Sequence, residues 1–526
     1  MPSGGLMSYP DPPNQPSWPS APPPGGQAPP PGAPFPPPQP SGPRSRAWLI
    51  PVAAGLSVVL MGTTVWASSA LVDNVFGGAQ PESALPASAI VFAELDLKPT
   101  GRQWASYAQF AGKLPDTLKN ELGDVEEGPA RQLVEEAFPE LDYDSEVEPW
   151  LGRRFGLALW PTSTPGASLP GDEGLALALA VAVEDEEAAG EALAKVRSRQ
   201  EHFFFEVDDD FALLSYSQGA LDDLAAQMEA HGSLADAPDY SSDMNAIGSD
   251  NIASAWADLA AAAEVATTAT GLSSPYGTDP DDFGEVSGRL AMALRIEGDY
   301  LELRGDTFEV TYGGSPMEGL AGENPGLSEL AELPDDSVLA VGGDNLDTLA
   351  TRLWEDNREL LEEIPEFPDF EMALAEMGVS LPGDFPRLLG SRTAFAITGS
   401  LAGSSDSWSS GTSFQYRAAG ADRELFEDLL AGSGGGPAPG VSDDGGTVVV
   451  SYGTTGTGRL GDDPLFRQTM AGLEKSNIGF YLDVRDVLAA EGQGDAAQWG
   501  ALGGSVSYDD EGNSSLVARW APSGGA

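Results

Sequence analysis

The sequence contains no cysteine and only two histidines among its 526 residues. The absence of cysteine excludes disulfide bonds, thiolate metal sites, a cysteine nucleophile and a lipidated N-terminal cysteine. The two histidines, His202 and His231, lack the spacing to a second ligand that zinc sites use. The sequence therefore predicts no metal-binding or cofactor-binding residue, and any exported part of the chain must be held together by its core alone.

Basic residues are scarce as well. The chain has 26 Lys and Arg against 82 Asp and Glu, a formal net charge of −56. Residues 1–72 carry Arg44 and Arg46 against Asp11, a net of +1, so the remainder carries −57. A field of this sign repels nucleic acid and anionic lipid headgroups, which excludes both as direct partners of the region after residue 72.

What the chain does contain is a stretch, residues 47–72, without a single charge. At about 1.5 Å per residue, a helix of this length crosses a bilayer. Tryptophans near its two ends suit the headgroup level. Two arginines precede it and acidic residues follow it, so we expect a single-pass membrane protein with a cytoplasmic N-terminus and an extracytoplasmic C-terminal region.

A cleaved signal peptide is the alternative interpretation, because the small residues Ala67 to Ala70 resemble a cleavage site. Two features favour the uncleaved anchor. The apolar stretch is longer than the usual h-region of about 7–15 residues, and a long tail rather than a short basic segment precedes it.

That tail, residues 1–46, is rich in proline and almost free of aliphatic residues. Such a composition cannot bury enough surface to offset the entropy of ordering the backbone, so we expect a disordered or polyproline-like cytoplasmic segment. It is either a ligand for proline-binding proteins or a solvated spacer, and the spacer is the commoner case.

The remaining residues carry an internal duplication. Five short matches recur in the same order in two stretches, residues 81–312 and 327–526, which meet near a Gly-rich segment. The sequence therefore predicts two extracytoplasmic units of one topology, with a ligand or partner bound in a groove between them. The matched residues are Leu85-Pro86 with Leu333-Pro334, Leu151-Gly152 with Leu389-Gly390, Asp185 with Asp422, Ser215-Tyr216 with Ser451-Tyr452, and Asn251 with Asn477.

Within each unit, strand and helix patterns alternate. Residues 88–97 and 174–183 read as strands, and Asp185 stands at the N-cap of a helix with an apolar stripe. Asp422 and Asp463 begin helices of the second unit in the same way. Closing hairpins indicate antiparallel pairing. The predicted class is α+β: two duplicated, largely antiparallel sheets with helices packed on a face, outside one N-terminal transmembrane helix.

Several of these residues also carry a resemblance. The segments Leu85-Pro86, Glu148-Pro149-Trp150-Leu151-Gly152 and Val183-Glu184-Asp185 resemble a family of actinobacterial membrane proteins of unknown function. The resemblance covers most of residues 71–520. It implies a proline-rich cytoplasmic head, one transmembrane helix and a duplicated extracytoplasmic region. It implies no catalytic residue.

The candidates for chemistry are weak. The loop Gly456 to Gly461 fits a dinucleotide fingerprint, but Asp462 and Asp463 follow where a pyrophosphate would lie, so we interpret it as a turn. Acidic runs could bind calcium, yet most fall at predicted turns, where Asp bonds its own backbone. Three further acids, Asp96, Asp258 and Asp483, end strands before helices and are interpreted as caps. These acidic runs are Asp208 to Asp210, Asp279 to Asp282, Asp443-Asp444, Asp462-Asp463 and Asp509-Asp510.

The sequence therefore assigns no catalytic, cofactor or metal residue. It favours a non-enzymatic binding or scaffold module of the cell envelope. Two alternatives stay open: a hydrolase of envelope glycans that uses a pair of carboxylates, and a carrier of hydrophobic ligands.

Overall fold

The computed structural model describes residues 80–96, 101–121, 131, 141–169, 174–208, 210–249, 251–262, 286–312, 315–316, 321, 326–356, 358–362, 367–399, 413–431, 439–490 and 492–524. The predicted tail and the predicted membrane segment, residues 1–72, lie outside these. Within the described residues, no helix is both long and apolar enough to cross a membrane.

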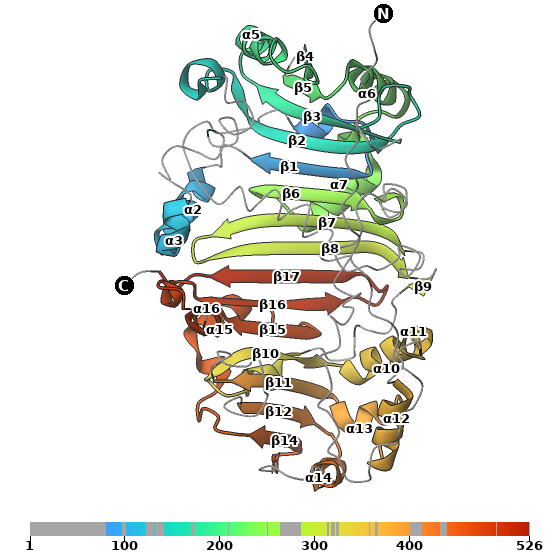
Figure 1. Cartoon of the computed structure of the whole chain (residues 1–526), viewed down its shortest axis with the longest axis vertical. Coiled ribbons are helices and arrows are strands. Elements are labelled where there is room, and N and C mark those ends of the chain that lie inside the picture. The colour runs from blue at the N-terminus through green and yellow to red at the C-terminus, as the bar shows by residue number, and fades with distance from the viewer. Residues whose placement is uncertain are drawn as a thin grey trace, which may run out of the picture. The chain divides into compact units, whose positions relative to one another are not determined.

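The described strands form one large antiparallel sheet of 17 strands, with helices on its faces, so the class is mixed α+β (Figure 1). The elements of the first half are η2 (Pro81–Ser83), β1 (Val91–Asp96), α2 (Gly101–Lys113), α3 (Asp116–Glu121), η3 (Tyr143–Val147), β2 (Leu151–Pro161), β3 (Leu175–Val183), α5 (Glu186–Arg197), β4 (Phe204–Asp208), β5 (Phe211–Ser215), α6 (Gln218–His231), η4 (Leu234–Asp236), α7 (Pro238–Ile247), β6 (Ala253–Asp258), β7 (Val286–Glu297), β8 (Tyr300–Tyr312) and β9 (Ser315–Pro316).

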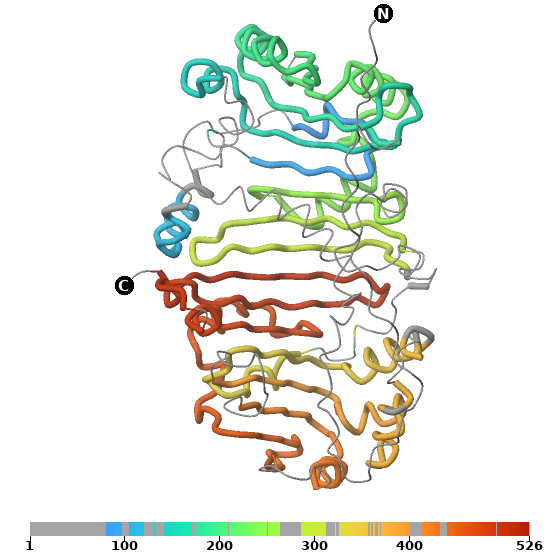
Figure 2. Tube along the Cα trace, viewed as in Figure 1, coloured from blue at the N-terminus to red at the C-terminus, as the bar shows by residue number. Residues whose placement is uncertain are grey.

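The second half follows along the chain (Figure 2). Its elements are α9 (Ser328–Ala331), β10 (Ser337–Asp344), α10 (Leu346–Asp356), α11 (Arg358–Glu362), α12 (Phe367–Glu376), α13 (Phe385–Leu389), β11 (Arg392–Thr398), β12 (Ser413–Ala419), α14 (Arg423–Ala431), β13 (Gly440–Asp444), β14 (Thr447–Tyr452), η6 (Leu460–Asp462), α15 (Pro464–Met470), β15 (Ile478–Asp483), α16 (Val484–Ala490), η7 (Ala496–Gln498), β16 (Ala501–Tyr508) and β17 (Ser514–Ala521).

The strands of the two halves pair with one another in the same order. In the first half the order across the sheet is β4-β5-β3-β2-β1-β6-β7-β8. In the second half it is β13-β14-β12-β11-β10-β15-β16-β17. The two halves then meet because β8 pairs antiparallel with β17 (Figure 1).

The expectation of two separate sheets is therefore wrong. β8 and β17 each stand at the last position of their half, where an unpaired strand exposes a row of N–H and C=O groups. Pairing with each other satisfies both rows, which merges the halves into one sheet. The expectation of helices on one face is also wrong, because α6 and α7 cover one face while α5 packs on the other.

Local capping follows the sequence closely. The side chain of Asp185 accepts a hydrogen bond from the Ala188 N–H at 3.0 Å, and Asp463 accepts from two N–H groups of α15. Asp422 likewise accepts from the Leu425 N–H at 3.3 Å. These three predicted caps are confirmed.

The core lies mainly between the sheet and the helices on the α6 and α7 side. In the first half it includes the fully buried Trp160 and Phe92, with Tyr240 stacked edge-on against Trp256 at 5.8 Å. The second half has a comparable core around Tyr481, which Phe466 contacts edge-on at 5.5 Å.

Candidate functional site

A buried acidic cluster lies on the helix-covered side of β1. Glu94 of β1 forms an ion pair with Arg154 of β2, with 3.3 Å between Oε1 and Nε. Burial raises the pKa of Glu94 to about 7, while Arg154 opposes the rise and the neighbouring Glu82 adds to it. Burial also raises the pKa of Glu82, whose Oε2 has no hydrogen-bond partner in the structure. Two partly buried carboxylates thus lie near one half-buried arginine, and one of them, Glu94, forms an ion pair with it.

The cluster is tightly packed rather than open. Gly156 pairs with Glu94 across β1 and β2, and a Cβ added there would lie 2.5 Å from Pro81 and 3.0 Å from the Phe92 ring. Burial raises the pKa of Tyr240 as well, with smaller contributions from both acids. A glycan could not reach these carboxylates without displacing core side chains, so the geometry does not favour the carboxylate hydrolase.

Two other buried acids serve the fold. Asp223 accepts a hydrogen bond from the Trp160 indole N–H at 2.8 Å. Asp243 accepts from the Trp256 indole at 2.9 Å and from Arg289 at 2.8 Å. Because their carboxylate oxygens already have partners, both are structural. Sequence reasoning missed them, since an acid in a helix gives no signal of which indole it will meet.

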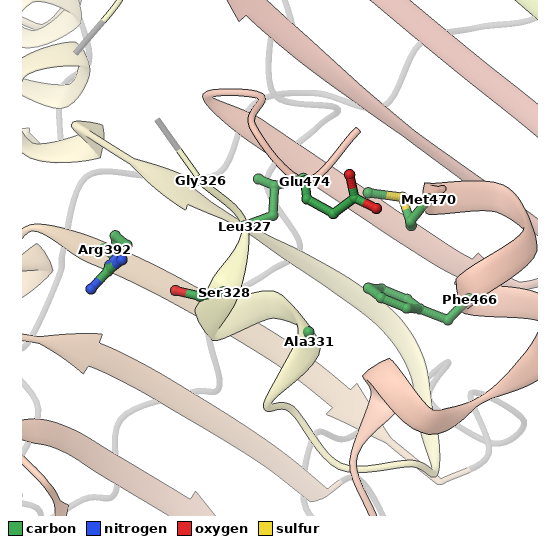
Figure 3. Close-up of a pocket in the computed structure, with 8 residues that line it drawn as sticks. All are labelled: Gly326, Leu327, Ser328, Ala331, Arg392, Phe466, Met470 and Glu474. Carbon is green, nitrogen blue, oxygen red and sulfur yellow. The ribbon is translucent and has the colours of Figure 1, made fainter. Parts of the chain in front are cut away.

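A cavity of about 210 Å³ lies in the second half, beside α9 and α15 (Figure 3). Its lining is mostly apolar, with Arg392 and the Ser328 hydroxyl on one side. The carboxylate of Glu474 points toward Met470, away from Arg392, and accepts the Gly472 N–H at 3.0 Å. The lining residues are Gly326, Leu327, Ser328, Ala331, Arg392, Phe466, Met470 and Glu474.

The sheet face opposite α6 and α7 is apolar across both halves. Directly opposed residues on neighbouring antiparallel strands point to the same face, so the strand register defines a row of side chains. This row has no charged or hydrogen-bonding side chain before Tyr416 at its end. It consists of Phe155, Leu95, Ala253, Leu294, Leu303, Ala518, Gly504, Phe480, Val341, Phe395 and Tyr416.

The ends of this row pack against helices, and α2 packs on the same face at the neighbouring positions Ile296, Leu301 and Trp520. Phe155 packs against the cluster that includes α5, and Tyr416 stacks on Phe426 of α14 at 5.5 Å. Leu294, Leu303 and the other central members belong to no described core cluster. Most are half-buried, and Val341 is 40% exposed.

The candidate site residues predicted from the sequence lie outside both the cavity and the apolar row. The N–H groups of Gly456 and Gly458 donate to Asp336 and Asp335, so the glycine loop is a turn bound by the chain's own carboxylates. Asp258 accepts the Ala261 N–H after β6, and Asp483 accepts the Arg485 N–H at the start of α16, so both are caps as predicted; Asp483 also binds the Arg485 side chain. Asp96 is buried and binds Arg153, and residues 97–100, which follow it, lie outside the described residues.

The acidic runs that the structure describes lie mainly at turns. Asp443 accepts the Gly446 N–H in the β13–β14 turn, and Asp509 accepts two N–H groups in the β16–β17 turn. Residues 279–282 lie outside the described residues. Among the described ones, no group of three His, Asp or Glu side chains could hold a metal ion. The lining of the cavity in Figure 3 belongs to the second half, not to the junction of the halves.

Comparison with known proteins gives limited information. A family described as "Protein of unknown function (DUF3352)" matches residues 50–206, less than a third of the chain, so the chain is similar to an uncharacterised family there. No curated protein matches the chain. The solved structure of TP0453 in crystal form III is 7% identical, with a TM-score of 0.25 over 46% of this chain and 83% of that one. These values carry no argument about fold or function.

Proposed function

We propose that the protein is a non-enzymatic binding module of the cell envelope, held outside the membrane by residues 47–72, whose sheet binds an apolar ligand. The observation that carries the proposal is the apolar row that crosses both halves. The uncharged length of residues 47–72 and the arginines before it support the anchor and its orientation.

Duplication of one unit is part of this proposal. It is supported by the strand orders of the halves, in which β1 through β8 correspond one by one to β10 through β17. It is also supported by matching details. Pro86 and Pro334 each form an isolated bridge, and α7 and α15 each begin with proline.

The contrast between the two sheet faces supports ligand binding on the face opposite α6 and α7. On the helix-covered face, small residues such as Ala158, Ala293 and Ala394 are 0 to 1% exposed. The opposite face carries larger side chains, including Leu294, Leu303 and Phe480, which are only half-buried. An apolar face whose central side chains are only half-buried is available to contact further apolar material.

The occupant we propose is an acyl chain of an envelope lipid. Residues 47–72 are the long apolar segment outside the described part, and if they span the membrane they cannot also cover the sheet. A row without charged side chains offers nothing to a headgroup, whereas it matches a hydrocarbon chain along its length.

The test is photo-crosslinking of the full chain in its membrane with a diazirine-labelled fatty acid, followed by peptide mapping. We expect labelled peptides from β7, β8, β16 and β17. The double variant Leu303→Gln/Leu516→Gln places amides on this face and should reduce their labelling by at least about tenfold, because tenfold corresponds to about 1.4 kcal/mol and full burial of one leucine contributes roughly 2 kcal/mol.

The matched control is Leu353→Gln on α10, since Leu353 is 45% exposed and lies away from the sheet row. Labelling of this variant should equal that of the unaltered protein. Labelling confined to residues 47–72 in every variant would show that only the bilayer, and not the sheet, meets the lipid.

A further inference from the structure

The strand registers give two arginines the same place in the two halves. Arg154 of β2 lies opposite Asp96, the last residue of β1. Arg392 of β11 lies opposite Asp344, the last residue of β10. Each arginine side chain lies on the helix-covered face of its half, as do the alanines that follow it at intervals of two residues.

Glu94, the acid that pairs with Arg154, has no counterpart beside Arg392. Two residues before Asp96 is Glu94, which forms the ion pair with Arg154. Two residues before Asp344 is Gly342, which has no side chain to offer. Among the described residues, no carboxylate forms an ion pair with Arg392.

Asp344 does not replace the missing acid. Burial raises its pKa and Arg392 opposes that rise, so the two charges are near each other, but they form no ion pair. Instead, Oδ1 of Asp344 accepts a hydrogen bond from Asn477 at 3.4 Å. Arg392 is exposed at the start of β11, so its donors are open to solvent or to a ligand.

The cavity of Figure 3 lies beside this arginine. Its far wall holds Phe466, the third residue of α15, and the corresponding residue of α7 is Tyr240. In the first half, Tyr240 lies near both Glu82 and Glu94, whose charges act on its hydroxyl. The cavity beside Arg392 is lined mostly by apolar side chains, and it does not occupy the place of Glu94 itself, because a Cβ at Gly342 would lie 2.7 Å from the Thr393 carbonyl oxygen.

We propose that this cavity binds a small carboxylate with an apolar body, whose carboxylate pairs with Arg392 as Glu94 pairs with Arg154. Arginine presents a planar fork of donors that matches a carboxylate in two contacts. The Ser328 hydroxyl, on the same side of the cavity, can donate to the ligand as well. Leu327, Phe466 and Met470 contact the apolar body.

The size of the cavity limits the ligand. An apolar cavity of about 150 Å³ accommodates benzene, so the 210 Å³ here fits a single ring or a short branched chain. The site is therefore distinct from the extended sheet face proposed for acyl chains, and it lies on the opposite side of the sheet.

The test is ¹⁹F NMR titration of the full chain in detergent micelles with 4-fluorobenzoate, with micelles alone as the blank. Binding should broaden and shift the resonance in a saturable way. The uncharged 4-fluorobenzamide, which has the same ring, should bind at least about tenfold more weakly, because it cannot pair with the guanidinium.

Three variants distinguish binding at Arg392 from non-specific binding to the protein. Arg392→Gln should weaken 4-fluorobenzoate by about tenfold and leave 4-fluorobenzamide unchanged. Arg392→Lys should retain part of the affinity, because it keeps the charge but not the fork. Arg467→Gln removes a charge from the exposed side of α15 and should bind as the unaltered protein does. Equal binding of acid and amide, or no effect of Arg392→Gln, would overturn the proposal.

Discussion

Arg304 of β8 lies directly opposite Val517 of β17, at the centre of the strand pair that joins the two halves. Two residues to one side, Glu302 faces Arg519, and two residues to the other side, Asp306 faces Ser515. Arg519 Nε donates to Glu302 at 2.9 Å, and the Ser515 hydroxyl donates to Asp306 at 2.6 Å. Both acids are buried, so the junction of the halves is a polar seam within the sheet.

Because of this polar seam, we expect the stability of the protein to depend on Arg519. In the variant Arg519→Leu, Glu302 stays buried and keeps, among the described residues, only the ion pair with Arg295 at 3.6 Å. We expect a loss of about 3 kcal/mol in the free energy of unfolding, measured in urea, because a buried charge is left without its main partner.

The matched control is Arg423→Leu, because Arg423 and Glu427 form an exposed pair on α14. It should cost less than about 1 kcal/mol. The double variant Glu302→Gln/Arg519→Leu should recover part of the loss, since no buried charge remains. Equal losses for Arg519→Leu and Arg423→Leu would contradict the prediction.

The junction also shows where sequence reasoning ends. Alternating Leu301, Glu302, Leu303 and Arg304 predicts a strand with one apolar and one polar face. It gives no sign that Glu302 and Asp306 are buried, because their partners Arg519 and Ser515 come from the other half, over 200 positions later in the chain. Local caps such as Asp185 were predictable, since a cap depends on residues within one turn.

The candidate cavity could not be predicted for a related reason. Its key feature is Arg392, which lacks an acid such as Glu94 provides for Arg154, because Gly342 stands at that position in β10. A glycine in a strand usually signals a bulge or a close approach, and only the register of both halves shows which acid it replaces. The proximity of Glu82 to Glu94 could not be predicted from the sequence either, because the two acids come from separate elements.

The acidic turns lead to a prediction about metals. Asp443 and Asp509 each accept N–H groups of their own turn, so their oxygens already have partners without a cation. Addition of EDTA should therefore leave the midpoint of thermal unfolding unchanged, and calcium in excess should not raise it. A rise with calcium that EDTA reverses would show that a cation site had been missed.

The uncharged segment leads to a prediction about the membrane. The full chain should remain in the membrane fraction after washing with alkaline carbonate, because one spanning helix inserts almost irreversibly. In the variant Leu60→Arg/Met61→Arg, two charges near the middle of the segment cost about 5 kcal/mol and should release protein into the wash. A mature chain that begins near Leu71 would instead support the cleaved signal peptide.

Glu94 leads to a prediction about pH. Its pKa is about 7 in the folded protein, above the 4.5 of an exposed glutamate. Between these values the folded state binds more protons than the unfolded state, so the contribution of Glu94 to stability falls as pH rises from about 4.5 to about 7. At higher pH the cost of the buried charge levels off at roughly 3 kcal/mol.

The variant Glu94→Gln removes this cost, because its amide is neutral at every pH. It should match the unaltered protein in unfolding free energy near pH 4 and exceed it by up to roughly 3 kcal/mol at pH 8. Acids away from this cluster titrate alike in both proteins and cancel, so the difference between the two curves reports Glu94 together with its interaction with Glu82. The control Glu297→Gln, at an exposed position on β7, should follow the unaltered protein throughout. The contrary result is that Glu94→Gln loses stability relative to the unaltered protein as the pH rises from 4 to 8. It would show that the ion pair with Arg154 outweighs the cost of burying Glu94.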